Sequence, residues 1–272
     1  GKEKTIKAMS VVIAAGGFGA NMDMITEYKP ELKNYVTTNQ EGATGDGIDM
    51  AKELGAATVD MDKIQIHPTV YQEKSFLVSE AIRGEGAILV NAEGKRFYNE
   101  METRDNFSAA INALPERYAY VIFDQELRSH SKSIDTYEEM GMTVKADTIE
   151  ALAKEIGVPE ANLKATVDSW NKYVEAKNDT EFGRATGMDR NMTKAPFYAI
   201  KIAPGIHHTM GGLKINTKTE VLKEDGTAIP GLYAAGEVTG GVHGSNRIGG
   251  NAVADIIIFG RQAGTQSAAY SK

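Results

Sequence analysis

The sequence predicts an α/β fold at the two ends of the chain and a mixed α+β region inserted between them. Both ends are rich in glycine and carry apolar, β-branched runs that stop at glycine turns, which is typical of buried strands. The middle, residues 63–206, mixes helical and strand-like patterns. We therefore expect residues 1–62 and 207–272 to form one discontinuous domain, and residues 63–206 to form a second. The length of 272 residues suffices for both.

The first expected element is a buried strand. Residues 8–15 are apolar and β-branched, and they lead into the tight glycine turn 16–19. A polar, glycine-bearing segment at residues 39–46 follows. It leads into residues 47–55, which have the pattern of a short helix that ends in glycine.

Two pairs of short strands are expected further along the chain. Residues 88–91 and 95–98 are strand-like and flank the turn 92–94, which indicates a hairpin. Residues 213–216 and 220–222 have the pattern of antiparallel strands.

The helical pattern is strongest between residues 147 and 177. It predicts two helices interrupted at residues 157–159, with Thr148 as the N-cap of the first. Four apolar residues of the second helix recur at helical spacing and are expected in the core: Leu163, Val167, Trp170 and Val174. The chain then closes with a turn and buried strand at 229–237 and an apolar helix at 252–264.

Composition excludes several classes of protein. The net charge of -7 argues against a nucleic-acid binder, which presents a basic surface. There is no cysteine, so disulfides, thiolate metal sites and iron–sulfur ligation within this chain are excluded. No apolar run is long enough to span a membrane, and the polar residues 1–4 lead towards the first strand without a visible signal peptide. A soluble protein is expected, and the compartment, cytoplasmic or periplasmic, stays open.

The residues with chemical potential are clustered in five short segments. Residues 205–212 and 244–252 set a histidine pair and an arginine among glycines, which suits holding a carboxylate against a flat cofactor. Upstream lie residues 65–69, 79–84 and 103–105, which add a histidine, a serine, a glutamate and two arginines. The five histidines are too widely spread for a metal site. The glycines at 16–19 have the wrong spacing for a dinucleotide-binding fingerprint. No Walker A sequence occurs either.

These five segments, in this order, resemble the flavoprotein subunit of soluble bacterial fumarate reductases of the flavocytochrome c type, in the fumarate reductase/succinate dehydrogenase flavoprotein superfamily. The resemblance implies that residues 1–62 and 207–272 are the C-terminal part of a Rossmann-like FAD-binding domain, and that residues 63–206 are the capping or clamp domain that covers the substrate. It also implies a longer polypeptide, whose dinucleotide fingerprint precedes residue 1.

The resemblance further implies FAD-dependent reduction of fumarate to succinate, by hydride transfer from the reduced flavin N5 and proton delivery from Arg104. Glu80 and Arg83 match the relay that recharges this arginine. His207 and Arg247 are expected to bind one carboxylate of the substrate, with His208 in support. His67 and Ser79 are expected to bind the other carboxylate; the family usually has threonine at the serine position, and the hydroxyl donor is kept.

The cofactor expected from the resemblance is FAD, bound non-covalently, with much of its site outside this chain. Glycines allow close backbone approach, Glu237 can accept from hydroxyls of the cofactor, and the start of the last helix can present amide groups to the flavin. The expected contacts are Gly16, Gly17, Gly45, Asp46, Gly47, Glu237, Asn251, Ala252 and Val253. No metal is expected.

Alternatives stay open at this point. A related 2-enoate reductase of the urocanate or acrylate type, a succinate dehydrogenase, and a non-catalytic dicarboxylate-binding fragment all fit. A ketosteroid-type dehydrogenase of the same fold would need an apolar pocket with tyrosines. The electron donor is expected in a module outside the chain, carrying haem, FMN or NADH, and the sequence leaves open the oligomeric state and whether the chain alone binds FAD.

Overall fold

The chain divides into two compact units, seen in a computed structural model that describes residues 4–272. Unit 1 comprises Gly1–Gln65 with Ile206–Lys272, and unit 2 comprises Ile66–Gly205. The first three of the polar residues expected to lead towards a strand lie outside the described residues. Two strands, β3 (Ile64–Tyr71) and β8 (Phe197–Thr209), belong to both units.

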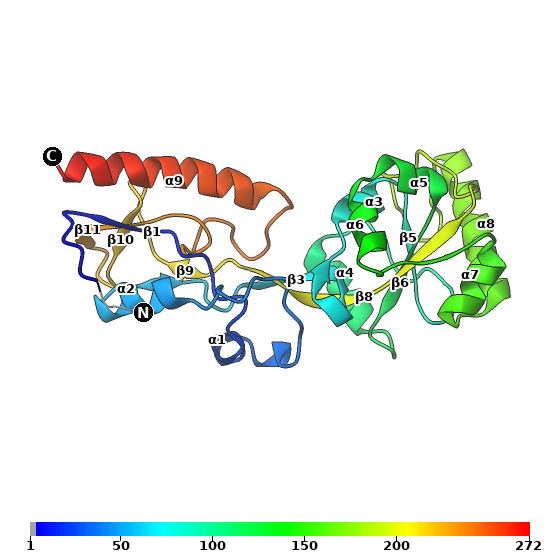
Figure 1. Ribbon diagram of the computed structural model, residues 1–272, viewed down its shortest axis with the longest axis horizontal. Helices are drawn as coiled ribbons and strands as arrows, with labels where there is room; N and C mark the ends of the chain where they lie inside the picture. The colour runs from blue at the N-terminus through cyan, green and yellow to red at the C-terminus, as the bar shows by residue number, and fades with distance from the viewer. Residues whose placement is uncertain (1–3) are drawn as a thin grey trace. The chain divides into compact units, whose positions relative to one another are not determined.

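Unit 1 is built on a three-stranded sheet in the order β1-β11-β10. β1 runs parallel to β11, and β10 runs antiparallel to it. Helix α9 lies along one side of this sheet and α2 along the other (Figure 1). The elements of unit 1 are β1 (Val11–Ile13), α1 (Met22–Tyr28), α2 (Asp46–Glu53), β2 (Thr58–Val59), β9 (Gly212–Leu213), β10 (Glu220–Leu222), β11 (Ala228–Ala234) and α9 (Asn251–Tyr270), with a 3-10 turn η1 at Pro30–Leu32.

The prediction of a buried first strand is half right. A strand forms at Val11–Ile13, but Val11 is 53% exposed. The reason is that β1 is the edge strand of its sheet, so no further strand among residues 4–272 pairs with its outer side. Helix α9 is also longer than predicted and displays an exposed run of isoleucines, Ile256, Ile257 and Ile258. Unit 1 therefore carries apolar surface that the described part of the chain leaves uncovered.

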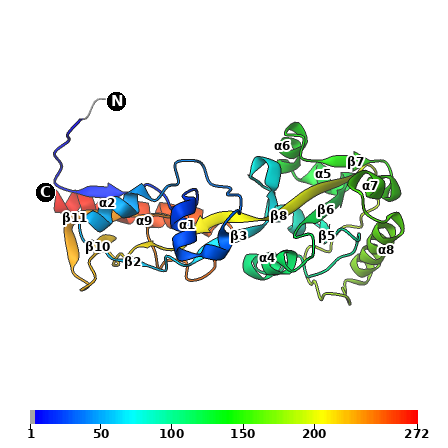
Figure 2. The ribbon, with the colours of Figure 1, turned by 90° about the horizontal axis from the view of Figure 1, so that it is seen from below.

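Unit 2 is built on a sheet in the order β4-β3-β8-β6-β5, with β7 also paired to β8. Alternate residues of β5, β6 and β8 point to opposite faces, so each face has its own core. Figures 1 and 2 show α7 and α8 on the side of the sheet opposite α6. The elements of unit 2 are η2 (Gln72–Lys74), β4 (Phe76–Leu77), α3 (Glu80–Gly84), β5 (Ile88–Val90), α4 (Arg104–Asn112), β6 (Ala119–Asp124), α5 (Gln125–His130), α6 (Ser133–Glu139), β7 (Val144–Ala146), α7 (Ile149–Ile156) and α8 (Glu160–Ala176).

The two predicted helices between residues 147 and 177 are confirmed as α7 and α8. The Thr148 side chain accepts from the Ala151 amide and caps the first helix, as predicted. Gly157 adopts a left-handed conformation and ends it. The four apolar residues assigned to the core are all buried: Leu163, Val167, Trp170 and Val174.

The predicted hairpin at residues 88–98 is wrong in its second half. β5 forms, but residues 95–98 are not a strand, and β5 pairs with β6 instead. The wholly buried run of β6 supplies a central strand between β5 and β8. Arg96, in the failed strand, donates hydrogen bonds to Glu100 and Asp179, so buried charge pairing decides the path of this segment.

Other boundaries shift by a few residues. The predicted helix at 47–55 is α2, and the predicted strand at 229–237 is β11. The pairing predicted between residues 213–216 and 220–222 is reduced to a single bridge, Ile215 with Val221, because Leu213 pairs with β2 and β10 pairs with β11. No helix among residues 4–272 is long and apolar enough to cross a membrane.

Gly212 marks a close approach of two backbones in unit 1, and its substitution should destabilise the protein. A Cβ added there would lie 2.3 Å from the Val238 carbonyl oxygen, so Gly212→Ala should lower the free energy of unfolding by about 2–3 kcal/mol. Denaturant unfolding measures this loss. The control is Gly264→Ala in α9, where nothing lies within 4 Å of an added Cβ and alanine favours the helix. Equal stability of the two variants would contradict the steric argument.

Candidate active site

In unit 2 the carboxylate of Glu80 is the centre of a cluster of three cationic or potentially cationic groups. Arg104 Nε donates to Glu80 Oε1 over 2.6 Å. The same oxygen lies 3.7 Å from Arg83 Nη2 and 3.8 Å from His67 Nε2. The structure thus brings together four residues from three separate segments of the sequence, all of them predicted for the site.

Local structure explains how these side chains meet. Glu80 is the first residue of α3, where a carboxylate interacts favourably with the helix N-terminus. Arg104 is the first residue of α4, where the positive helix end disfavours a cation, so its pairing with Glu80 offsets an unfavourable position. The side chains of Arg83 and Arg104 are buried, whereas the side chain of Glu80 is 37% exposed.

The guanidinium of Arg83 has a lowered pKa. Burial lowers the pKa of its guanidinium to about 10, and the nearby Arg104 acts in the same direction, whereas Glu80 opposes the shift. An arginine with such a pKa releases a proton more readily than a solvated one.

Ser79 caps α3. Its Oγ accepts from the Ala81 amide over 3.2 Å, and its own amide donates to the Tyr137 hydroxyl over 2.9 Å. Because the hydroxyl serves the cap as an acceptor, its hydrogen can still be donated elsewhere. The His67 ring is buried in β3, where its Nδ1 lies 3.3 Å from the Thr69 amide.

In unit 1, His207 and Arg247 are each held by a neighbour that sequence reasoning missed. His207 Nδ1 lies 2.7 Å from Thr38 Oγ1, which fixes the ring. Gln65 Nε2 donates to the Arg247 carbonyl over 2.8 Å and to Asn246 Oδ1 over 2.6 Å. Gln65 stands in one of the five motif segments and could have been singled out, whereas nothing in the sequence around Thr38 marks it.

His208 belongs to a second cluster. Its Nδ1 lies 3.2 Å from Glu237 Oε2, while Glu237 Oε1 accepts from the Thr209 amide over 2.9 Å. Burial raises the pKa of Glu237, but hydrogen bonds from His208 and Thr209 outweigh it and hold the pKa below its usual value. His208 Nε2 is buried and has no hydrogen-bond partner among the described residues.

A further histidine, His243, was not predicted. Its ring packs edge-on against that of His208, with centroids 5.6 Å apart, and its Nε2 lies 3.1 Å from the buried carboxylate of Asp255. The contact joins the loop that carries Arg247 to helix α9. Among residues 4–272 no group of three or more His, Cys, Asp or Glu side chains could hold a metal ion.

The glycines predicted to contact FAD fall into two kinds. Gly16 has a left-handed backbone and nothing within 4 Å of an added Cβ, so it leaves room for a ligand. A Cβ on Gly17 would lie 2.0 Å from Thr209 Oγ1, and one on Gly47 would lie 2.8 Å from Ile13. Gly45 is similarly crowded, by Met24 and Phe18. The last three are therefore explained by packing within unit 1.

The start of α9 fits an anionic or carbonyl group of a cofactor. Its N-cap, Gly250, is left-handed and supplies no side-chain cap, while the Asn251 and Val253 amides donate to the Ile248 and Gly250 carbonyls. Asn251 and Val253 are exposed there and Ala252 is partly exposed. Asp46, at the start of α2, is also exposed and accepts from Thr44 Oγ1 over 2.7 Å. Together with the buried orphan nitrogen of His208, these residues fit a bound flavin.

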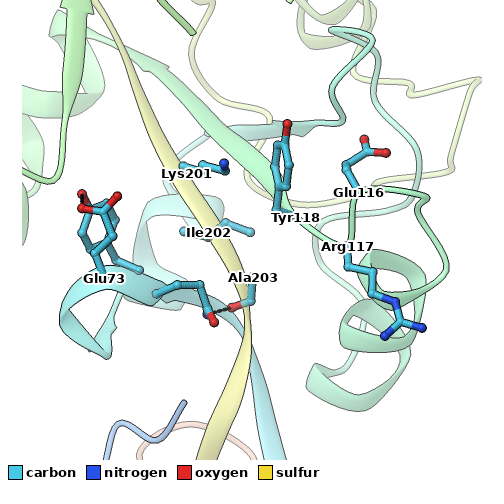
Figure 3. Close-up of a pocket in the computed structure, with 9 residues that line it drawn as sticks. Glu73, Glu116, Arg117, Tyr118, Lys201, Ile202 and Ala203 are labelled. Atoms are coloured by element: carbon cyan, nitrogen blue, oxygen red, sulfur yellow. Dashed lines mark hydrogen bonds between the residues drawn. The ribbon is translucent and has the colours of Figure 1, made fainter. Parts of the chain in front are cut away.

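A pocket of about 330 Å³ in unit 2 contains none of the predicted site residues. Its floor is the β8 segment Lys201–Ala203, with Glu73 on one side and Tyr118 on the other (Figure 3). The lining carries two acidic and two basic side chains, so its charge favours no class of ligand: Glu73, Glu116, Arg117 and Lys201.

Glycine turns and an uncapped helix start in a mixed α/β fold are typical of domains that bind a nucleotide cofactor. A family model described as an FAD binding domain matches residues 1–253. The chain belongs to this FAD-binding family, and FAD is the cofactor that the family indicates.

Three known proteins are similar to the chain over almost its whole length. The NADH:fumarate oxidoreductase of Klebsiella pneumoniae is 54% identical over 97% of this chain and 28% of that protein. The NADH:acrylate oxidoreductase of Vibrio harveyi is 42% identical over 93% of this chain and 26% of that protein. A solved structure, the open conformation of a flavocytochrome c3 fumarate reductase, is 50% identical with a TM-score of 0.78, and covers 97% of this chain and 46% of that one.

These similarities confirm the predicted resemblance to fumarate reductase flavoproteins, and the mixed α/β fold is similar to that of an FAD-dependent enzyme. The chain spans less than half the length of each of these proteins.

Proposed function

We propose that this chain supplies the substrate-binding and proton-delivering residues of an FAD-dependent reductase that converts fumarate to succinate. The observation that carries the proposal is the convergence of Arg104, Arg83 and His67 on one carboxylate oxygen of Glu80. Reduction of the alkene requires a hydride on one carbon and a proton on the other, and such a cluster suits delivery of the proton.

Arg104 is the proton donor in this mechanism. An ordinary guanidinium holds its proton too tightly to act as an acid. Here Arg104 is paired with Glu80 over 2.6 Å, and the same carboxylate lies 3.7 Å from Arg83, whose pKa burial lowers to about 10. Glu80, whose oxygen is 2.6 Å from Arg104 Nε, returns the proton, and Arg83 supplies Glu80 in turn.

The two carboxylates of the substrate are bound by different sets of residues. His207 and Arg247 bind one, because the planar guanidinium matches a carboxylate fork and the ring of His207 is fixed by Thr38. His67 and Ser79 bind the other, and His208 supports its neighbour through Glu237. Binding of both carboxylates holds the alkene in the orientation needed for attack.

FAD, when bound, supplies the hydride. The residues proposed to hold it are Gly16, Glu237 and the start of α9 at Asn251, Ala252 and Val253. Gly17, Gly45, Asp46 and Gly47 shape the surrounding turns.

We further propose that unit 1 is the C-terminal part of a Rossmann-like FAD-binding domain and that unit 2 is its capping domain. The exposed edge of β1 and the exposed isoleucines of α9 support this, because such a surface is expected where further strands and helices of the same domain pack. The electron donor is proposed to be a separate module that carries haem, FMN or NADH.

The proposal is tested by an anaerobic assay. The protein that contains this chain, loaded with FAD, is mixed with a chemically reduced viologen dye and fumarate, and oxidation of the dye is followed. Oxidation that depends on fumarate supports the proposal. A flavin-loaded sample that leaves the dye reduced contradicts it, and a colourless sample calls for the same assay on a longer polypeptide.

Glu80→Gln should lower kcat for fumarate about 100-fold, because the relay loses the group that recharges Arg104. Steady-state kinetics with the reduced dye measure this. A matched control is Glu85→Gln, which breaks a partly exposed pair with Arg190, 2.6 Å long and worth less than about 1 kcal/mol. If both variants turn over at the normal rate, Glu80 is part of a local ion pair and not of a relay.

A related 2-enoate reductase is the second candidate. It is favoured by the 42% identity to an acrylate oxidoreductase. A panel of fumarate, acrylate and urocanate in the dye assay distinguishes the two, since retention of His67 and Ser79 predicts the highest kcat/KM with the dicarboxylate.

A further inference from the structure

Unit 2 contains a network of four charged side chains that is withdrawn from solvent. Arg96 Nε donates to Glu100 Oε1, and its Nη2 donates to Glu100 Oε2, each over 2.8 Å. Arg96 Nη2 also donates to Asp179 Oδ2 over 2.9 Å, and Arg184 Nη1 lies 3.3 Å from Glu100 Oε2. The side chains of all four residues are at most 1% exposed.

An aromatic ring completes the network. The guanidinium of Arg96 lies 5.0 Å from the ring centroid of Trp170, and that of Arg184 lies 4.5 Å from it. A buried set of ions is no more stabilising than well-packed apolar residues of the same size, because removing charges from water is costly. Its presence in the core therefore suggests that it fixes a particular geometry.

The network reaches the predicted proton relay through the backbone of two residues. The carbonyl oxygen of Glu100 accepts from Arg83 Nη1 over 2.6 Å. Arg184 Nη2 donates to the Arg83 carbonyl, and Arg184 Nη1 donates to the Ala87 carbonyl over 2.9 Å. The guanidinium of Arg83 is thus hydrogen-bonded to the Glu100 carbonyl, and the carbonyl of Arg83 is hydrogen-bonded to Arg184.

The same network also holds the chain segment that leads into Arg104, the proposed proton donor. Glu100 lies four residues before Arg104, and its Oε1 accepts from the Leu89 amide over 3.3 Å, which ties the segment to β5. Displacement of Glu100 would therefore move Arg83 and the start of α4 together.

We propose that Glu100 and Arg184 are positioning residues, which hold Arg83 and Arg104 on either side of Glu80 so that protons pass along the cluster. The inference rests on the proposed function, because it assigns these residues to the relay of that same site. Neither residue is expected to touch the substrate.

The test compares three variants of the FAD-loaded protein. Glu100→Gln removes the charge that orients Arg96 and Arg184. Arg184→Lys keeps a charge but loses the planar guanidinium that donates to four backbone carbonyls, those of Arg83 and Ala87 among them. This variant decides the question if Glu100→Gln fails to fold. The matched control is Asp124→Asn, another buried carboxylate of unit 2, which caps α5 and has no contact with the relay among its described hydrogen bonds.

The first readout separates positioning from stability. Glu100→Gln and Arg184→Lys should each lower kcat at least 10-fold while the KM for fumarate changes less than 3-fold, and the solvent deuterium effect on kcat should rise because proton delivery becomes slower. Asp124→Asn should lower the melting temperature without these kinetic changes. Normal kcat in folded Glu100→Gln and Arg184→Lys would overturn the proposal.

The second readout needs no turnover. In nitrogen-15 NMR spectra of the arginine side chains, the Nε–H of Arg104, bonded to Glu80, should exchange with solvent at least 10-fold faster in the two network variants than in wild type and control. Unchanged exchange would overturn the proposal. If wild-type protein fails to reduce fumarate, the proposed function fails, and this exchange measurement still decides whether Glu100 and Arg184 position the cluster.

Discussion

Arg104→Gln should abolish most of the proton delivery and lower kcat for fumarate about 1,000-fold, the middle of the range for a general acid. The arginine is buried, begins α4 and donates to Glu80 over 2.6 Å, so no solvent molecule is expected to take its place efficiently. The KM for fumarate should change much less than kcat, because Arg104 acts on the transition state. Steady-state and single-turnover kinetics with the reduced dye measure both parameters.

Two further variants make this result interpretable. Arg104→Lys keeps a charge but cannot keep the Nε contact, so it should recover only part of the rate. Arg190→Gln removes an arginine of the same unit that pairs with partly exposed Glu85, and it should leave kcat unchanged. Wild-type turnover in Arg104→Gln would show that the proton comes from another group.

The second large effect is expected at Arg247. Arg247→Gln should lower kcat/KM for fumarate about 100- to 1,000-fold, because removal of one partner from a buried charge pair costs about 3–4 kcal/mol. The loss should appear in KM as well as in kcat, since the carboxylate is bound before and during reduction. Titration with succinate, the product, should show a comparable loss of affinity.

The control for Arg247 lies on the same unit. Arg261→Gln removes an exposed arginine of α9 and should leave both constants unchanged. Arg247→Lys should be intermediate, because lysine binds a carboxylate as a point charge without the bidentate fork. Equal values of kcat/KM for Arg247→Gln and Arg261→Gln would remove Arg247 from the substrate site.

The parts of the fold that could be predicted are those governed by local pattern. Thr148 and Gly157 bound α7 because a capping hydroxyl and a left-handed glycine act within a few residues of the helix. Residues 95–98 could not be predicted in the same way. Their strand-like pattern was overridden by Asp179, a partner 83 positions from Arg96 in the chain, with which that arginine pairs.

The candidate site likewise contains residues that the sequence predicted and residues that it did not. Motifs in the sequence predicted His67, Glu80, Arg83 and Arg104, and the structure places all four in one cluster. Their roles in binding and catalysis remain predictions. Thr38 and Glu100 were missed because they act through contacts that only folding creates, whereas Gln65 stands in a motif segment and could have been singled out.

By itself the sequence determined the family and the cofactor, since these depend on short motifs whose order along the chain is enough to identify them. Only the tertiary structure decided which side chains meet. It showed that several glycines are needed for close packing and that the Glu80 carboxylate contacts three neighbouring side chains. It also showed that Arg83 is hydrogen-bonded to a member of a buried ion network. The physical reason is that hydrogen bonds and ion pairs act over a few ångströms, and residues far apart in sequence come within that range only in the folded chain.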